Sequence, residues 1–239
     1  MPQKDFITWL ASYPRSGNTW FRALWHHYLE LPTYAAHAEN HRNAHPIPIG
    51  ADRHDPSRAQ VSALTKTHWR SHDDGRPAIC LVRDGRDVAV SYFHYLREID
   101  GKALPDELLQ ARIAYGDIMF GSWQNWMQQW LVRRKTPVDI VWTFDELISG
   151  LDRTIILKTL EAIDAPEILT TRCLKATGSP PTFERLQKMD PKFFRKGVTG
   201  DHKNYGDWID LFCEQQSEGM QMWYALQNTA PEERGKMFR

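Results

Sequence analysis

The sequence has few of the features that mark stapled, membrane or nucleic-acid-binding proteins. It holds only 3 cysteines, widely spaced and without a C-x-x-C pair, so neither a disulfide framework nor a zinc site is indicated. No apolar run approaches the roughly 18 residues that a membrane span needs. The 30 acidic residues balance the 30 basic ones, which excludes the basic profile of a nucleic-acid-binding protein. We therefore expect no membrane span, no metal and no nucleic-acid partner.

The sequence also lacks a signal-type hydrophobic region, because its first residues run directly into a short apolar strand. We expect a cytoplasmic protein with reduced thiols.

The chain of 239 residues, 41% of them hydrophobic, is long enough to bury a core without disulfides, and we expect a single domain over 1–239. Short apolar runs alternate with helical patterns, which predicts an α/β fold with a parallel sheet flanked by helices. The expected strands are 6–12, 61–67, 78–83 and 139–143. The expected helices begin near 18 and cover 87–97, 108–134 with a break near 116–121, 151–163, 168–175, 183–189 and 208–226. Residues 32–60 and 192–207 lack periodicity and are expected to be loops.

A phosphate-binding turn is indicated at residues 12–20, S-Y-P-R-S-G-N-T-W, where the first strand meets the first helix. Such a turn aims backbone N–H groups and a helix N-terminus at one point, and Gly17 permits close approach of an anion. Further donors are the side chains of Arg15, Ser16, Asn18 and Thr19. The nucleoside triphosphatase pattern G-x-x-x-x-G-K-[ST] is absent. An ordinary strand-to-helix turn with capping residues also fits this stretch taken alone.

Arg83 and Ser91 lie eight residues apart in L-V-R-D-G-R-D-V-A-V-S-Y, across a second strand-to-helix turn. A planar guanidinium and a hydroxyl at this spacing suit one anion. A solvated turn of compensating charges is the alternative, and it is favoured if this motif is taken without the first one.

Lys66 and His68 stand at the end of the predicted strand 61–67, in L-T-K-T-H. Ligands of parallel α/β sheets bind outside the carboxyl ends of the strands, and histidine is the natural base for an alcohol or phenol near neutral pH. A structural role for His68 stays open, since the chain holds 10 histidines.

Adjacent positive charges, Arg195 and Lys196, precede Gly197 in F-F-R-K-G-V-T-G-D-H-K-N-Y. A loop of this kind suits closure over a polyanion, while a solvated basic loop is the alternative.

Together and in this order, the four stretches resemble the cytosolic sulfotransferases that use 3′-phosphoadenosine 5′-phosphosulfate (PAPS), and they run from residue 12 to residue 204. The resemblance implies a P-loop-like fold, PAPS as co-substrate without a metal, and adenosine 3′,5′-bisphosphate (PAP) as product. It also implies that the sulfuryl group is transferred to a hydroxyl or amine of a small-molecule, natural-product or glycan acceptor. The chain is compact for this family, which favours an open acceptor site.

The resemblance also implies roles for individual residues. The 5′-phosphate is expected among Arg15, Ser16, Gly17, Asn18 and Thr19. The 3′-phosphate is expected at Arg83, Ser91, Arg195, Lys196 and Gly197, and the adenine at Trp20, Phe183 and Phe144. His68 is expected to take the proton of the acceptor, while Arg15 and Lys66 stabilise the negative charge of the departing PAP.

Three positions depart from the family pattern. Arg15 stands where the family usually has Lys, and an arginine can act as a charge and fork donor but hardly as a general acid. Phe144 stands where a Tyr is usual, so one hydrogen bond to adenine is in question. Residues 203–212 do not reproduce the motif by which many family members pair, which leaves the oligomeric state open.

Two other functions fit parts of the sequence. An ATP-dependent phosphoryl transferase with a related fold is disfavoured, because the Walker lysine is missing and no clear Mg²⁺-binding carboxylate follows a strand. A non-enzymatic nucleotide-binding module is disfavoured by the presence of His68. The acceptor pocket is expected near residues 32–60 and the tryptophans Trp123, Trp126 and Trp130, although aromatic residues at helical spacing also fit a core.

Overall fold

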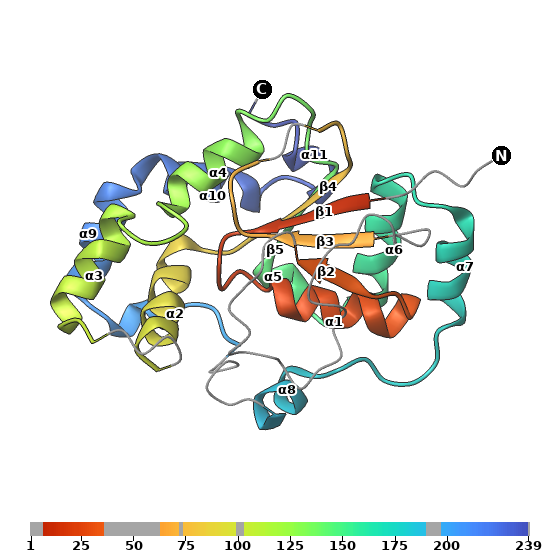
Figure 1. Ribbon diagram of the computed structural model, residues 1–239, viewed down its shortest axis with the longest axis horizontal. Helices are drawn as coiled ribbons and strands as arrows, with labels where there is room; N and C mark the ends of the chain where they lie inside the picture. The colour runs from red at the N-terminus through yellow and green to blue at the C-terminus, as the bar shows by residue number, and fades with distance from the viewer. Residues whose placement is uncertain (1–6, 36–62, 72–73, 99–102, 190–196, 239) are drawn as a thin grey trace.

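The computed structural model describes residues 7–35, 63–71, 74–98, 103–189 and 197–238, and it is built around a five-stranded parallel sheet (Figure 1). The strands lie in the order β2-β3-β1-β4-β5, and every neighbouring pair is parallel. Their bounds are β1 Ile7–Ser12, β2 Thr33–Ala35, β3 Ala63–Thr67, β4 Ala78–Val82 and β5 Ile140–Thr143. The predicted α/β fold with a parallel central sheet is confirmed.

The central strands are apolar because both faces of the sheet are covered, as is usual for parallel sheets. Successive side chains of a strand point to opposite faces. In β1 and β4, Leu10 and Ile79 therefore belong to one core cluster, while Ala11 and Cys80 belong to the other. All five residues of β4 are buried.

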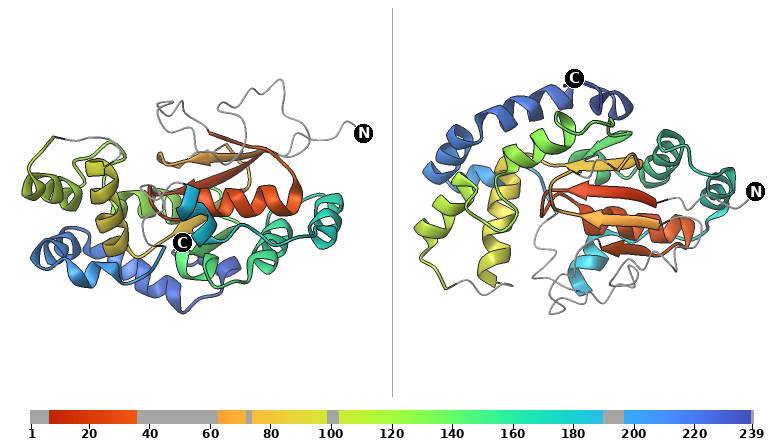
Figure 2. Two further views of the ribbon diagram at one scale, coloured as in Figure 1. Left: turned by 90° about the horizontal axis from the view of Figure 1, so that it is seen from below. Right: turned by 45° about the horizontal axis from the view of Figure 1, so that its top comes forward.

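Two groups of helices cover these two faces. The core cluster of Leu10 contains residues of α1 (Asn18–Leu29), α5 (Phe144–Leu147), α6 (Asp152–Ala162), α7 (Glu167–Lys175) and α8 (Phe183–Met189). The cluster of Ala11 contains residues of α2 (Gly85–Glu98), α3 (Asp106–Tyr115), α4 (Trp123–Leu131), α9 (Asp207–Gln215) and α10 (Ser217–Gln227). The two groups lie on opposite sides of the sheet in Figures 1 and 2, and none of the described helices is long and apolar enough to cross a membrane.

Two expectations about secondary structure are wrong. Thr33–Ala35 forms an edge strand against β3, although it falls in the segment 32–60 that was expected to be a loop. The expected helix 208–226 is two helices that meet at Gln216. The side chain of this buried Gln216 accepts a hydrogen bond from the Gln124 backbone N–H (2.9 Å) and donates one to the Ala114 carbonyl (2.8 Å). These tertiary contacts hold the break between the helices.

Short helices that the sequence analysis did not predict are α5, the 3₁₀ turn η3 (Asp201–Asn204) and α11 (Pro231–Arg234). Residues 36–62 and 190–196, which include most of the expected loop 32–60 and the start of the expected loop 192–207, lie outside the described residues.

Candidate active site

The candidate site lies at the carboxyl edge of the sheet, where β1, β3 and β4 end side by side. Hydrogen bonds join the described parts of all four predicted stretches there. Ser12 contacts His68, Arg15 contacts Ser91, and Arg83 contacts both the turn after β1 and the segment that begins at Gly197. Segments that lie far apart in the sequence therefore meet at this edge, as the parallel-sheet rule predicts.

The turn between β1 and α1 presents backbone donors. Arg15 and Gly17 both have positive φ, 73° and 95°, which is the left-handed conformation that only glycine adopts without strain. Gly17 is the N-cap of α1 and supplies no side-chain cap to the first N–H groups of the helix, which have no acceptor within the helix itself. A Cβ at Gly17 would lie 3.0 Å from side-chain atoms of Phe144 and Leu147, so a side chain at this position would be tightly crowded.

An anion fits this turn. The Oγ of Ser16 is buried and has no hydrogen-bond partner among the described residues, so it is a polar atom that an added ligand can satisfy. Helix N-termini with exposed N–H groups bind phosphate by backbone hydrogen bonds and by the helix dipole. Ser16, Gly17 and the start of α1 therefore have the chemistry that a phosphate group requires.

His68 is oriented by the same turn. Its Nδ1 lies 2.7 Å from the carbonyl oxygen of Ser12, and this oxygen can only accept a hydrogen bond, so Nδ1 carries the proton. In the neutral ring the lone pair is then on Nε2, the nitrogen that can take a proton. The Ser12 hydroxyl also lies 3.2 Å from Nδ1 and accepts a hydrogen bond from the Asn18 side chain (3.1 Å). The last residue of β1 thus fixes the tautomer of His68 through its carbonyl group, and its hydroxyl group is in turn held by the start of α1.

Lys66 lies on β3, two residues before His68, and its strand neighbour in β1 is Leu10. Residues two apart in an extended strand share a face. The side chain of Lys66 is largely buried, with 9% of the residue exposed. In a low-dielectric environment an ammonium group stabilises nearby negative charge strongly, so Lys66 suits a role at an anion site.

Charged and polar side chains gather where β4 ends. The Nε of Arg15 donates to the Ser91 hydroxyl (3.1 Å), and the Arg15 guanidinium lies over the Tyr95 ring at 5.4 Å. Arg83 donates to the carbonyl oxygens of Arg15 (3.2 Å) and Val198 (2.7 Å). Arg15 therefore reaches from the first turn to α2, a contact that spacing along the chain does not predict.

Aromatic rings line the next part of the site. The rings of Trp20 and Phe183 are 6.5 Å apart, and a Cβ at Gly197 would lie 2.4 Å from the Phe183 ring. The Trp20 indole N–H donates to the Leu147 carbonyl (3.0 Å), which fixes its ring. The Phe144 ring lies 4.2 Å from the Arg83 guanidinium and forms a cation–π contact. The structure brings these predicted residues together, whereas Arg195 and Lys196 lie outside the described residues.

Sequence reasoning missed Phe120 and its anchor. The Phe120 ring packs edge-on against His68 (5.5 Å) and against Trp69 (5.2 Å). The buried Tyr13 hydroxyl donates to the adjacent Gly121 carbonyl at 2.6 Å, and burial raises the pKa of Tyr13 well above its usual value, which keeps it a neutral donor. The glycines at 116 and 121 signalled a break between helices, but nothing in the sequence signalled that this break reaches His68.

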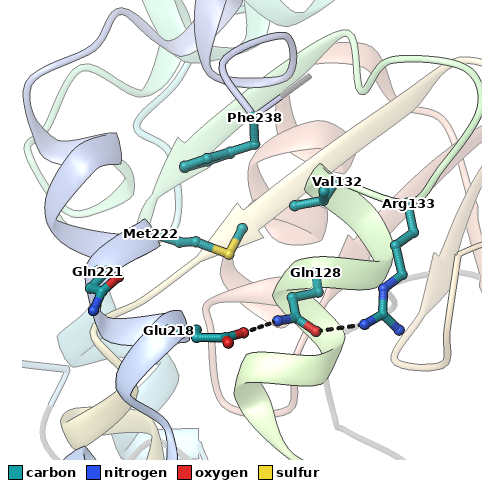
Figure 3. Close-up of a pocket in the computed structure, with 7 residues that line it drawn as sticks. All are labelled: Gln128, Val132, Arg133, Glu218, Gln221, Met222 and Phe238. Atoms are coloured by element: carbon teal, nitrogen blue, oxygen red, sulfur yellow. Dashed lines mark hydrogen bonds between the residues drawn. The ribbon is translucent and has the colours of Figure 1, made fainter.

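The expected pocket tryptophans are core residues. Trp123, Trp126 and Trp130 are almost completely buried in the cluster of Ala11. An open hollow of about 490 Å³ lies between α4 and α10, and none of the candidate site residues lines it (Figure 3). Its walls are Gln128, Val132, Arg133, Glu218, Gln221, Met222 and Phe238. Within the described residues, no group of three or more His, Cys, Asp or Glu side chains is placed to hold a metal ion.

Comparison with known families gives a match over nearly the whole chain. Residues 5–234 match the family model described as "Sulfotransferase domain". The chain is 29% identical over 162 residues to Sulfotransferase 1B1 of Mus musculus, a match that covers 61% of this chain and 52% of the mouse protein. It is 26% identical over 270 residues to Sulfotransferase 1A1 of Bos taurus, covering 94% of this chain and 85% of the bovine protein.

Solved structures of similar fold include mouse sulfotransferase SULT7A1 complexed with PAP. Its TM-score is 0.63 at 18% identity, with 94% of this chain and 90% of that chain covered. A retinol dehydratase in a complex with retinol and PAP gives a TM-score of 0.57 at 17% identity, with 96% and 83% covered. At these identities the likeness establishes the fold.

Proposed function

The chain belongs to the sulfotransferase domain family, and from that premise we propose that it transfers the sulfuryl group of PAPS to a hydroxyl or amine of an acceptor and releases PAP. The observation that carries the proposal is the hydrogen bond from Nδ1 of His68 to the Ser12 carbonyl, because it joins a candidate base to a phosphate-binding turn. Both of the similar structures are complexes with PAP, which supports the same donor.

Two anion-binding regions divide the nucleotide between them in this proposal. The 5′-phosphate lies at Ser16, Gly17, Asn18 and Thr19, where backbone N–H groups and a buried hydroxyl are available. The 3′-phosphate lies at Arg83 and Ser91, and Arg195 and Lys196 complete its site. Trp20 and Phe183 hold the adenine between them. The ring of Phe144 packs against the Arg83 guanidinium through its cation–π contact.

The chemistry needs a base and positive charge. When bound, PAPS supplies a sulfuryl group that is joined to its 5′-phosphate through one bridging oxygen. The Nε2 of His68 accepts the proton of the acceptor as the acceptor oxygen or nitrogen approaches sulfur. Lys66 and Arg15 stabilise the charge that develops on the bridging oxygen, and because Arg15 does not release a proton, its contribution is electrostatic.

The acceptor approaches His68 from the side of Phe120 and Trp69 in this account, since these rings border the imidazole. A small molecule with a hydroxyl or amine is the acceptor class that we propose, and a natural product or glycan belongs to the same proposal. Cytoplasmic location stays a prediction from the sequence.

Transfer of labelled sulfate from PAPS to a panel of simple phenols, alcohols and amines tests the proposal. His68→Ala is expected to lower turnover by about 10²–10⁴-fold, the range of general base catalysis, while PAP binding is unchanged. His26→Ala is the matched control, because His26 contacts the Leu31 carbonyl at the far end of α1. Near-wild-type turnover in His68→Ala would contradict the assignment of the base, and failure of the wild-type protein to transfer sulfate to any acceptor of the panel, together with failure to bind PAP, would contradict the function.

A further inference from the structure

A buried carboxylate outside the predicted site holds the segment that follows Gly197. Asp87 lies in the first turn of α2 and is 1% exposed. Its Oδ2 accepts a hydrogen bond from the Gly200 backbone N–H (2.7 Å). Its Oδ1 accepts two from His202, one from the backbone N–H (3.1 Å) and one from Nδ1 of the ring (2.7 Å). We refer to this arrangement of Asp87, Gly200 and His202 as the clasp.

The clasp compensates a charge that is costly to bury alone. An isolated carboxylate in a protein interior carries a large desolvation penalty, which hydrogen-bond donors and nearby positive charge offset. All three donors of the clasp come from residues 200–202, and the N-terminus of α2 adds a favourable dipole. Departure of the segment would leave Asp87 without these donors, so α2 and the segment are strongly coupled.

The clasp continues directly into the candidate nucleotide site. Two residues before Gly200, the Val198 carbonyl accepts the hydrogen bond from Arg83. One residue earlier, Gly197 packs against the Phe183 ring. Arg83 lies between β4 and α2, and Asp87 lies in the first turn of α2, so this short stretch of chain holds the segment at two places, by a guanidinium and by a carboxylate. The segment thereby has a fixed position beside Arg83.

We propose that Asp87 and His202 are positioning residues that set the affinity for the 3′-phosphate end of the nucleotide. This inference rests on the proposed function. The clasp holds Gly197 and Val198 against Arg83 before the nucleotide arrives, so little ordering of this segment remains to be done on binding. Neither side chain contacts the reacting atoms in this account, and their effect passes through the segment and Arg83.

Titration of PAP and of 5′-AMP, which lacks the 3′-phosphate, tests the inference. Asp87→Asn and His202→Ala are expected to weaken PAP about tenfold and 5′-AMP by less than about twofold, because a hydrogen bond to a charged group is lost on the 3′ side alone. The KM for PAPS rises by the same factor, whereas kcat changes less than about threefold. His202→Asn recovers most of the affinity, since its amide can still donate to Asp87.

His94→Ala is the matched control. His94 also joins α2 to the end of this segment, through Tyr205 (2.6 Å), but it is not part of the clasp. Its PAP affinity is expected to stay near the wild-type value. An equal loss in His94→Ala would overturn the inference, because any contact between α2 and the segment would then have the same effect.

Hydrogen exchange of the Gly200 and His202 amides without nucleotide gives a readout that does not depend on activity. Both amides are expected to exchange faster in Asp87→Asn than in the wild-type protein. If Asp87→Asn fails to fold, the PAP affinities of His202→Ala and His202→Asn are sufficient to test the inference. If the wild-type protein binds PAP and the clasp variants bind it equally well, the inference about the clasp is wrong. Wild-type protein that binds no PAP would overturn the proposed function itself.

Discussion

The turns after β1 and β4 are neighbouring strand-to-helix connections at the same edge of one sheet, yet they differ in what they offer an anion. At the first turn, the helix N-terminus has a glycine as N-cap and no side-chain cap. At the second, the Asp84 carboxylate accepts the Arg86 backbone N–H (2.9 Å) and pairs with the Arg86 guanidinium (2.6 Å). The chain caps its own helix at β4 and leaves the helix at β1 uncapped.

This difference determines how each turn can bind phosphate. The N-terminus of α1 can use backbone N–H groups and the helix dipole. At the N-terminus of α2, Asp84 accepts the Arg86 N–H and the buried Asp87 carboxylate adds negative charge, so an anion nearby must be held by side chains, and Arg83 and Ser91 supply them. Burial raises the pKa of the neighbouring Asp145, and Arg83 opposes that shift, so Arg83 also offsets negative charge around it. The two ends of the nucleotide are therefore expected to respond to different substitutions.

The largest expected effect on nucleotide binding comes from Arg83→Ala. The variant removes a buried guanidinium that contacts the Arg15 and Val198 carbonyls and, in our proposal, the 3′-phosphate. PAP affinity is expected to fall about a hundredfold, since two charge-assisted hydrogen bonds are lost, while 5′-AMP affinity stays nearly constant. Calorimetric titration of both ligands measures this selectivity. Equal losses of affinity for PAP and 5′-AMP would contradict the claim that Arg83 binds the 3′-phosphate selectively.

Gly17→Ala is expected to act on both ligands. The φ of 95° is strained for alanine, and the added Cβ meets Phe144 and Leu147 at 3.0 Å, so the backbone donors of the turn are displaced. PAP and 5′-AMP are expected to weaken together by about tenfold, the equivalent of roughly 1–2 kcal/mol of backbone strain. Titration of the folded variant, verified by thermal melting, checks this. A loss confined to PAP would assign the first turn to the wrong phosphate.

Ser91→Ala is expected to have a smaller effect of the same kind as Arg83→Ala. One neutral hydroxyl contributes about 0.5–1.5 kcal/mol, so PAP affinity falls roughly threefold to tenfold and 5′-AMP affinity does not change. The same pair of titrations measures it. Ser149→Ala is a suitable control, because the exposed Ser149 hydroxyl bonds to the Glu146 carbonyl instead.

The smallest expected effect is that of Arg15→Lys. The substitution keeps the positive charge but loses the Nε donor that reaches Ser91 at 3.1 Å. We expect a loss of PAP affinity of about threefold and a turnover within about threefold of wild type, because charge rather than fork geometry acts on the leaving group. Steady-state kinetics with PAPS checks this. A large fall in kcat with unchanged PAP binding would show that the fork itself acts in catalysis.

Local pattern made much of the fold predictable. β1 and β4 lie within one residue of their predicted bounds and α1 begins where it was predicted, because short apolar runs and amphipathic helices are visible in the sequence. β2 was missed because three residues carry no periodicity and its position depends on pairing with β3. The break at Gln216 was missed for the same reason, since it depends on distant partners in α3 and α4.

The sequence predicted part of the candidate site in the same way. Polar residues at the ends of strands gave the positions of Arg15, Lys66 and His68, and the topology brought them to one edge. The approach of Phe120 to His68 and the reach of Arg15 to Ser91 are properties of the folded chain. The tryptophans of α4 were expected near the acceptor, but hydrophobic burial places them in the core, as their spacing on one helix face also allows.

A side-by-side calorimetric titration of PAP, ADP and ATP, with and without Mg²⁺, tests the central claim most directly. The two-turn account predicts tight PAP binding that does not depend on Mg²⁺ and much weaker binding of ADP, because ADP has no 3′-phosphate for Arg83 and Ser91. A preference for ATP in the presence of Mg²⁺ would contradict the account and would point to phosphoryl transfer instead.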